Sequence, residues 1–129
     1  MKIDGGCHCG AITYEAEVDP RRTILCHCTD CQTISGAPYR VNVPVLRENF
    51  HLTGEPRHYR KRADGDGATA FCPTCGAALF SEKPGRPYVF LRTGGVRQRA
   101  ALPPMAQGFC RSAMPWSADI SAVPVVGPA

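Results

Sequence analysis

Cys26-His27-Cys28-Thr29-Asp30-Cys31 is the stretch of this 129-residue sequence that decides the fold, because it places three thiols within six residues. In an extended segment successive side chains point to opposite faces, so Cys26 and Cys28 share one face and His27 points away. Cys31 then lies in the first turn of a helix, where N–H groups and the helix dipole favour a thiolate. Three thiolates from one segment can hold one face of a tetrahedral zinc ion at about 2.3 Å each, with the fourth position supplied from elsewhere.

A short helical turn is expected directly after Cys28. Thr29, followed three residues later by Gln32, has the pattern of a capping box, so the helix should start here and run toward Gly36. The preceding residues 23–28 are expected to form the strand that delivers the first two thiols. The metal-binding element is therefore predicted to be a strand-to-helix junction.

The composition predicts mainly β structure. Twelve prolines, thirteen glycines and 8% aromatic residues are typical of short strands separated by many turns. Residues 1–18 are expected to form two strands around a tight turn, with one apolar face made by Ile12, Tyr14, Ala16 and Val18. Further segments are expected to form strands over 39–45, 50–54, 57–62, 69–71, 78–82 and 88–92, a hairpin loop over 63–67 and an irregular loop over 96–108. Pro44 indicates that its strand ends early or lies at a sheet edge.

The chain length suits one domain, expected over residues 1–116 and followed by a Pro-rich tail over 117–129. The first residues lack the apolar run of a secretory signal, and no stretch reaches the roughly 18 apolar residues of a membrane span. We therefore expect a soluble, cytoplasmic protein with no membrane partner. In that reducing compartment, eight cysteines favour metal binding or catalysis, and a disulfide framework is the minor alternative.

The formal net charge of +4 is mild, so it permits anionic ligands without demanding nucleic acid. The densest basic run is Arg57-His58-Tyr59-Arg60-Lys61-Arg62, whose alternation is typical of an exposed hairpin strand. A solvated face is the favoured interpretation of this run, and a phosphate-binding patch is the alternative.

Two further pairs of cysteines have metal-ligand spacing. Cys7 and Cys9 share one face of the chain, as alternate residues of an extended segment do. Cys72 and Cys75 form a Cys-x-x-Cys turn, and the following Gly76 allows the tight backbone that aims both sulfurs at one ion. Pairing the two doublets closes a four-cysteine site, which is a usual composition for structural zinc and would contribute folding energy.

This pairing changes the interpretation of the triplet. Cys26, Cys28 and Cys31 are left with one open position, as expected of a catalytic zinc that carries water or substrate. The count predicts two zinc ions per chain.

Two other ligand sets are possible. Cys110 can complete the triplet as a second closed site, although a lone cysteine is more often a small buried hydrophobe. The triplet can also pair with one doublet and leave the remaining thiols free. His8 and His27 are expected to face solvent or to support the ligands from outside, because strand alternation turns them away from the metal.

With these clusters placed, the chain resembles the family of the glutathione-dependent formaldehyde-activating enzyme, which also includes centromere protein V. The resemblance covers residues 5 to 116 and rests on four pieces in order: Gly6-Cys7-His8-Cys9-Gly10, the run from Cys26 to Gln32 leading to Ser35-Gly36-Ala37, Phe71-Cys72-Pro73-Thr74-Cys75-Gly76, and a terminal segment ending in Trp116. The resemblance implies a β-tent of small antiparallel sheets organised around zinc, with the two doublets holding the structural ion and the triplet the catalytic one.

The family's reaction is addition of the glutathione thiol to formaldehyde, classed with carbon–sulfur lyases. The resemblance therefore implies a zinc-dependent lyase acting on an aldehyde adduct of a small, glutathione-like thiol. Arg40 and Arg111 are plausible partners for the carboxylates of such a ligand. Two other functions compete with this one: a non-enzymatic zinc-stabilised module that binds protein or nucleic acid through residues 57–62, and a redox enzyme that uses Cys110.

Overall fold

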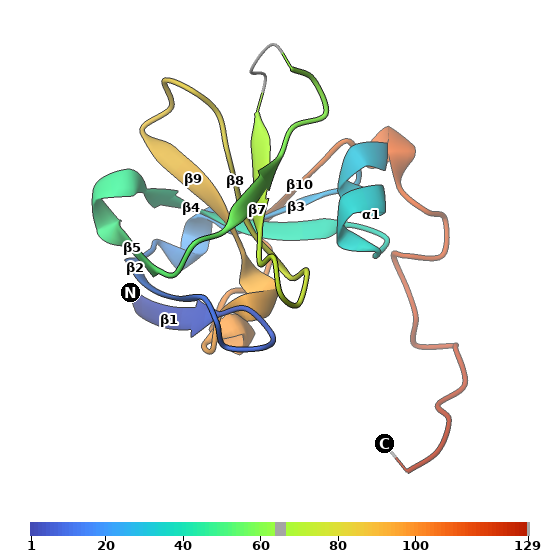
Figure 1. Cartoon of the computed structure of the whole chain (residues 1–129). Coiled ribbons are helices and arrows are strands. Elements are labelled where there is room, and N and C mark those ends of the chain that lie inside the picture. Colours follow the sequence, from blue (N-terminus) through green and yellow to red (C-terminus); the bar gives the residue numbers. More distant parts are fainter. Residues whose placement is uncertain (64–66, 129) are drawn as a thin grey trace.

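The computed structural model describes residues 1–63 and 67–128 and contains two β-sheets and one α-helix (Figure 1). The smaller sheet has the strand order β1 (Lys2–Gly6), β2 (Thr13–Glu17), β5 (Phe50–Thr53). The larger sheet has the order β10 (Ala106–Gly108), β3 (Ile24–Cys26), β4 (Arg40–Leu46), β9 (Tyr88–Arg92), β8 (Ala78–Glu82), β7 (Ala68–Phe71), β6 (Arg57–Tyr59). Helix α1 (Thr29–Ser35) follows β3, and 3-10 turns connect other elements: η1 (Pro20–Arg22), η2 (Arg47–Asn49), η3 (Thr93–Gly95), η4 (Arg99–Ala101), η5 (Cys110–Ser112).

The fold is mainly β, as the sequence predicts, and its helix starts directly after Cys28. The sheets differ from the expected small antiparallel ones in two respects. One of them has seven strands, and β10 pairs with β3 in parallel. No helix in the described ranges is long and apolar enough to cross a membrane.

The predicted alternation of β2 is confirmed. Ile12, Tyr14, Ala16 and Val18 are all buried, whereas the intervening side chains from Thr13 to Glu17 are exposed. The buried face of this small sheet packs on the large sheet and forms one side of the hydrophobic core.

Strands β4 and β9 form the other side of the core. Val43 lies opposite Leu91 and Val45 lies opposite Val89, and all four side chains are buried. Because side chains alternate along a strand, the residues between them face the opposite side of the sheet. That opposite face carries polar side chains, among them Asn42 and Arg92, and it forms the base of the site described below.

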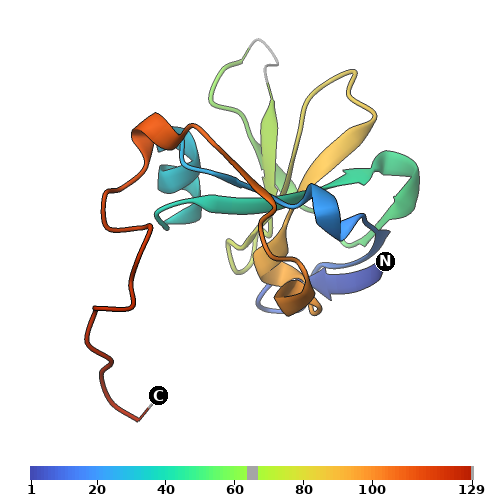
Figure 2. The same cartoon turned by 180° about the vertical axis from the view of Figure 1, so that it is seen from behind.

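Strand β10 is a correction to the irregular loop expected over residues 96–108. It pairs in parallel with β3, so that Gly108 lies opposite Cys26, and the back view shows the two segments side by side (Figure 2). The sequence Ala-Gln-Gly contains no β-branched or aromatic residue, so local propensity gave no signal. The pairing is imposed by β3, which leaves one edge free for it.

Pro44 lies within β4, in the interior of the large sheet, and not at its outer edge. Strand β3 pairs with β4 only over residues 40–42, so beyond Asn42 one side of β4 is without this partner. Pro44 lies in that part, where its lack of an N–H disrupts no ladder with β3. Similarly, β6 ends at Tyr59 and not at Arg62, because β7 begins at Ala68 and the last pair is Tyr59 with Thr69. Residues 64–66 of the expected hairpin loop lie outside the described residues.

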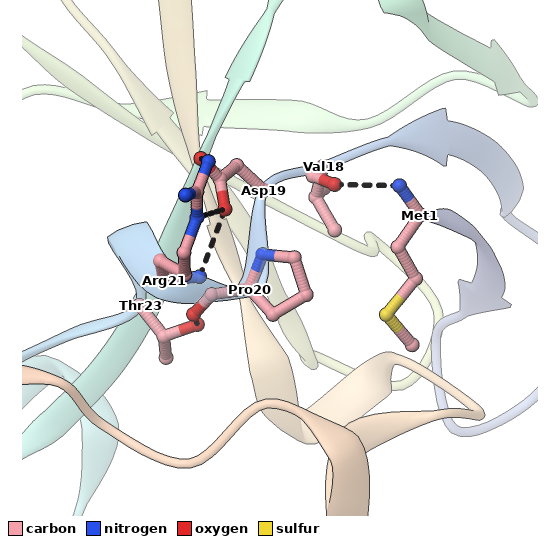
Figure 3. A network of polar contacts seen from close by, with 6 residues as sticks. All are labelled: Met1, Val18, Asp19, Pro20, Arg21 and Thr23. Atoms are coloured by element: carbon pink, nitrogen blue, oxygen red, sulfur yellow. Dashed lines mark hydrogen bonds and ion pairs between the residues drawn. The ribbon is translucent and has the colours of Figure 1, made fainter.

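A polar turn directs the chain into β3 (Figure 3). The Asp19 carboxylate accepts a hydrogen bond from the backbone N–H of Arg21 and pairs with its guanidinium at 3.0 Å. The Thr23 hydroxyl donates to the Pro20 carbonyl at 2.9 Å, and the N-terminal amino group donates to the Val18 carbonyl at 2.9 Å. The turn and the chain terminus are thereby fixed at the start of the strand that carries the first site cysteine.

The C-terminal segment leaves the body after η5 and runs away from it in both views (Figures 1 and 2). Its large apolar side chains are exposed, including Ile120, Val123, Val125 and Val126. The division into a domain over 1–116 and a tail over 117–129 stays a prediction.

Leu91 is fully buried in the core, so we expect Leu91→Ala to lower the free energy of unfolding by about 2–5 kcal/mol through lost burial and an unfilled cavity. Urea denaturation followed by circular dichroism measures the change. Leu46→Ala, at a 41% exposed position of neighbouring β4, should change stability by less than about 1 kcal/mol. Equal effects of the two substitutions would contradict the position assigned to the core.

Candidate functional site

Helix α1 begins on a cysteine. Cys28 is its N-cap residue, and the Cys28 Sγ accepts the backbone N–H of Cys31 at 3.3 Å. The expected capping box at Thr29 is therefore wrong by one position: Thr29 is already helical, and the sulfur has taken the place of the hydroxyl as acceptor. The helix ends at Gly36 in the left-handed conformation, with φ of 63°, as predicted from its glycine.

The three cysteines of this segment converge. The sulfurs of Cys26, Cys28 and Cys31 all lie within 4.8 Å of one another, and those of Cys28 and Cys31 are 3.0 Å apart. Cys31 is 2% exposed, whereas Cys26 and Cys28 are half-buried. All eight cysteines are free thiols, so the disulfide alternative finds no support here. The triplet can hold a metal ion.

The two doublets form a second cluster. Cys7 and Cys9 come from the turn after β1, Cys72 and Cys75 from the turn after β7, and their four sulfurs lie within 4.8 Å of one another. The Cys7–Cys9 and Cys9–Cys72 sulfur separations are 3.6 and 3.8 Å. Four sulfurs bound to one tetrahedral zinc at about 2.3 Å lie about 3.8 Å apart, so this spacing fits such an ion.

Backbone N–H groups favour the thiolate form in both clusters. Hydrogen bonds from the backbones of Ala77 and Cys9 lower the pKa of Cys75 to about 6. Burial alone raises the pKa of Cys28, but hydrogen bonds from the Cys31 thiol and backbone outweigh it, and the net pKa is lowered. Burial and the neighbouring Cys28 raise the pKa of Cys31. Each cluster thus contains a thiol whose surroundings favour the charge that a metal ligand carries.

The triplet borders a large pocket. Cys28 and Cys31 line a cavity of about 550 Å³ between α1 and the polar face of the large sheet, whereas none of the four clustered cysteines of the doublets lines it. Its other lining residues are Asp30, Thr33, Ile34, Arg40, Tyr59, Lys61, Gly67, Ala68, Thr69, Ser81, Glu82, Lys83 and Phe90. A small-molecule ligand in this cavity would therefore lie beside the triplet.

The positive charge of this pocket was predicted only in part. Arg40 lines the pocket, as its expected role requires, but Arg111 is exposed on η5 and does not line it. Arg92 lies on the same sheet face as Ser81 and Phe90, and sequence reasoning missed it. Its signal was weak: it is the one charged residue in the strand Tyr88–Arg92, at the end where exposure would be unremarkable.

A hydrogen-bond network attaches the C-terminal segment to the triplet. Gln32 donates from Nε2 to the carbonyls of His27, at 2.7 Å, and Ser112, at 2.9 Å. The imidazole Nε2 of His27 lies 2.9 Å from Oε1 of Gln107. His27 is thus buried and supports the site from outside the sulfur cluster, which is one of the two positions expected for it; His8 is exposed.

Cys110 does not join the triplet. It is exposed, and its sulfur lies 4.0 Å from the carbonyl of Gln107, outside the set of three sulfurs that lie within 4.8 Å of one another. The geometry therefore favours a three-cysteine cluster over one closed by Cys110.

The basic run forms β6 and the segment after it. Arg57, His58 and Tyr59 are exposed, His58 lies 3.3 Å from Glu82, and Lys61 pairs with Asp30 at 2.8 Å across the pocket. This arrangement matches the expected solvated face, with two of its side chains taken up by local carboxylates.

A known protein family matches most of this sequence. The family described as glutathione-dependent formaldehyde-activating enzyme matches residues 2–112. A curated protein of Halomonas elongata, named as a putative glutathione-dependent formaldehyde-activating enzyme, is 29% identical over an alignment of 87 residues that covers 62% of this chain and 55% of that protein. The match thus spans about half the length of this relative.

A crystal structure of a Rhodobacter sphaeroides protein, solved as a structural genomics target, superposes with a TM-score of 0.65. It covers 81% of this chain and 98% of its own, at 17% sequence identity. At that identity the likeness shows the fold alone.

Gln32 should hold the segment 106–112 on the site, so we expect Gln32→Leu to accelerate amide hydrogen exchange there by roughly 10-fold, because the Gln32 hydrogen bonds to the partly buried carbonyls of Ser112 and His27 are lost. Hydrogen-exchange mass spectrometry resolves this segment from β7–β9, which should be unchanged. Thr33→Ala, on an exposed turn of the same helix, is the matched control and should leave residues 106–112 protected. Unchanged exchange in Gln32→Leu would refute this role.

Proposed function

Because the chain belongs to the glutathione-dependent formaldehyde-activating enzyme family, we propose that it is a zinc-dependent carbon–sulfur lyase acting on the adduct of a small, glutathione-like thiol with an aldehyde. The observation that carries this proposal is the position of the triplet: Cys28 and Cys31 line a 550 Å³ pocket, and the four-cysteine cluster does not. This difference supports a substrate-binding role for the triplet and a structural role for the four-cysteine cluster.

The donor sets support zinc at both clusters, giving two ions per chain. Sulfur-only sets of three or four cysteines with sulfurs this close are typical of zinc sites. We assign Cys7, Cys9, Cys72 and Cys75 to a structural ion that joins the turns after β1 and β7. We assign Cys26, Cys28 and Cys31 to a catalytic ion, which they would hold with one position left for water or the substrate.

The reaction joins the sulfur of the thiol to the carbonyl carbon of formaldehyde. The S–H bond breaks, the C–S bond forms, and the C=O π bond becomes the lone pair of a hydroxyl oxygen that takes up the proton, giving R–S–CH₂–OH. Electrons and protons balance without an oxidant or reductant, and the reverse direction is the lyase reaction. When bound, zinc supplies a Lewis acid that lowers the pKa of a thiol or polarises the aldehyde oxygen.

Residues of this chain prepare the site for that chemistry. The N–H of Cys31 fixes the Cys28 sulfur, and the positive charge of Arg40 favours the thiolate form of both Cys28 and Cys31. The pocket beside them holds the thiol substrate with its sulfur directed at the aldehyde. This lowers the entropic cost of orienting the two reactants.

The remaining expectations accompany this proposal. Eight cysteines without a disulfide suit a reducing compartment, so we assign the protein to the cytoplasm. We likewise propose that residues 1–116 form the zinc-binding domain and that 117–129 is a tail without a part in the reaction.

Cys28→Ser should bind one zinc ion where the wild type binds two, and should lose thiol-dependent formaldehyde consumption by at least roughly 100-fold, because a hydroxyl is a poor ligand for zinc. Its circular dichroism spectrum should be retained, since the core does not include this residue. Elemental analysis counts the ions and NMR follows the hydroxymethyl product. Cys110→Ser is the control and should keep both ions and full activity; loss of activity in this variant alone would establish the redox function instead.

Cys72→Ser should lose the fold, which Cys28→Ser keeps, because it removes a buried ligand of the proposed ion that joins two distant turns. We expect loss of one ion together with loss of near-ultraviolet circular dichroism and a largely unfolded chain. A folded Cys72→Ser variant that keeps its melting temperature would contradict the structural assignment.

A further inference from the structure

Arg40 differs from the other charged side chains around the pocket. Asp30 and Lys61 pair with each other, and Glu82 pairs with Arg47 at 2.8 Å. The Arg40 side chain makes no hydrogen bond or ion pair with the described residues, and its Nε is buried without an acceptor. A guanidinium carries five N–H donors, so its capacity to bind an acceptor is available to a ligand.

A second guanidinium lies behind the first. Arg92 is 7% exposed and donates to three neutral acceptors: Asn42 Oδ1 at 3.0 Å, the Phe90 carbonyl at 3.3 Å and Ser81 Oγ at 2.7 Å. No carboxylate in the described part of the chain pairs with it, and its Nε is also without an acceptor. Burial, followed by the positive charge of Arg40, lowers the pKa of Arg92 to about 9.

The strand register explains why the two arginines act on the same space. Asn42 lies opposite Arg92, and Arg40 lies two residues before Asn42, so both arginines project from the same face of the sheet. Arg40 also lies opposite Cys26 in the β3–β4 pair. Arg40 therefore lies beside the triplet and lines the pocket, whereas Arg92 does not line it and donates hydrogen bonds to the pocket-lining Ser81 and Phe90.

Two like charges on one face of the sheet, with no carboxylate paired to them, repel each other and destabilise the folded state. The arrangement is stabilised when an anion enters the pocket, and a carboxylate fits a guanidinium through two parallel hydrogen bonds. The sulfurs of Cys28 and Cys31 line the same pocket and supply part of the compensating charge, but no carboxylate of the described residues forms an ion pair with Arg40 or Arg92.

We propose that Arg40, supported from behind by Arg92, binds a carboxylate of the thiol substrate, so that the pocket selects anionic thiols over neutral ones. This inference rests on the proposed function, and it adds the class of substrate and the residue that recognises it. Arg40 contacts the ligand in this arrangement, whereas Arg92 is a positioning residue that acts through the charge and through the Ser81 and Phe90 surface.

The experiment compares mercaptoacetate with its neutral amide, 2-mercaptoacetamide, as partners for formaldehyde, using the zinc-loaded protein. Arg40→Gln should raise KM for mercaptoacetate by roughly 10- to 100-fold, the effect of losing hydrogen bonds to a charged group, and KM for the amide by less than about twofold. The ratio of the variant KM to the wild-type KM is taken separately for each thiol, which cancels the effect of the difference in acidity between the two thiols. Arg60→Gln, which removes an exposed charge next to the pocket-lining Tyr59 and Lys61, should leave both ratios near one.

Equal losses for the two thiols in Arg40→Gln would overturn the inference, because they would mean that Arg40 only compensates the cysteine thiolates. Calorimetric titration of the wild type with S-methylglutathione, which carries carboxylates but no thiol, gives a readout independent of activity. Carboxylate recognition is supported if Arg40→Gln abolishes this binding and Arg40→Lys partly restores it. It is contradicted if the wild type does not bind S-methylglutathione or if Arg40→Gln binds it equally well.

The two proposals fail in different ways. A wild type that binds S-methylglutathione through Arg40 but converts no thiol would refute the lyase function and keep the anion site. If the wild type converts both thiols and Arg40→Gln raises KM equally for both, the lyase function stands and the anion site is refuted. Should Arg40→Gln not fold, inhibition of the wild type by acetate and acetamide, as competitors of mercaptoacetate, decides the matter. Stronger competition by acetate than by acetamide supports the anion site, and equal competition by the two contradicts it.

Discussion

The alternation of side chains along β4 and β9 is the constraint on which the rest of the structure depends. One face of this pair carries Val43, Val45, Val89 and Leu91 into the core. The other face, by the same geometry, must carry Arg40, Asn42 and Arg92. A register shift by one residue would exchange the two faces, so the apolar packing that stabilises the fold also fixes where the positive charge lies. The pocket is thus a consequence of the core and needs no separate scaffold.

The two sulfur clusters use the chain in opposite ways. The four-cysteine cluster joins Cys9 to Cys72, 63 residues apart, and so closes a long loop of the chain. Closing such a loop lowers the entropy of the unfolded chain, and an ion that holds it closed contributes directly to folding. The triplet comes from one segment between β3 and α1, and its cap hydrogen bond from Cys31 to Cys28 is local. Its geometry is set by the strand and the helix that flank it.

Sequence reasoning located the sulfur sets because ligand spacing is local and chemically specific. Cys72-Pro73-Thr74-Cys75 has few other uses, and the count of cysteines suggested which clusters meet. Three features escaped it because they depend on contacts between distant segments. Residues 106–108 become a strand only beside β3, Pro44 is tolerated because β3 stops short, and Arg92 enters the site through the register of β4 with β9. The N-cap at Cys28 was also not predicted, because cysteine is outside the usual set of capping residues.

The separation of the two clusters also bears on how the site can exchange ligands. Under the proposed function, an ion at the triplet would exchange a ligand during turnover, and a fold that depended on that ion would loosen with each exchange. The long loop is closed where Cys7, Cys9, Cys72 and Cys75 meet, and none of these four residues lines the pocket beside the triplet. Cys26, Cys28 and Cys31 are positioned by strand pairing, helix capping and the Gln32 hydrogen bonds, all of which are independent of a ligand in the pocket. These three cysteines therefore keep their positions without a ligand in the pocket, and the positive charge of Arg40 and Arg92 is available to the next ligand that binds.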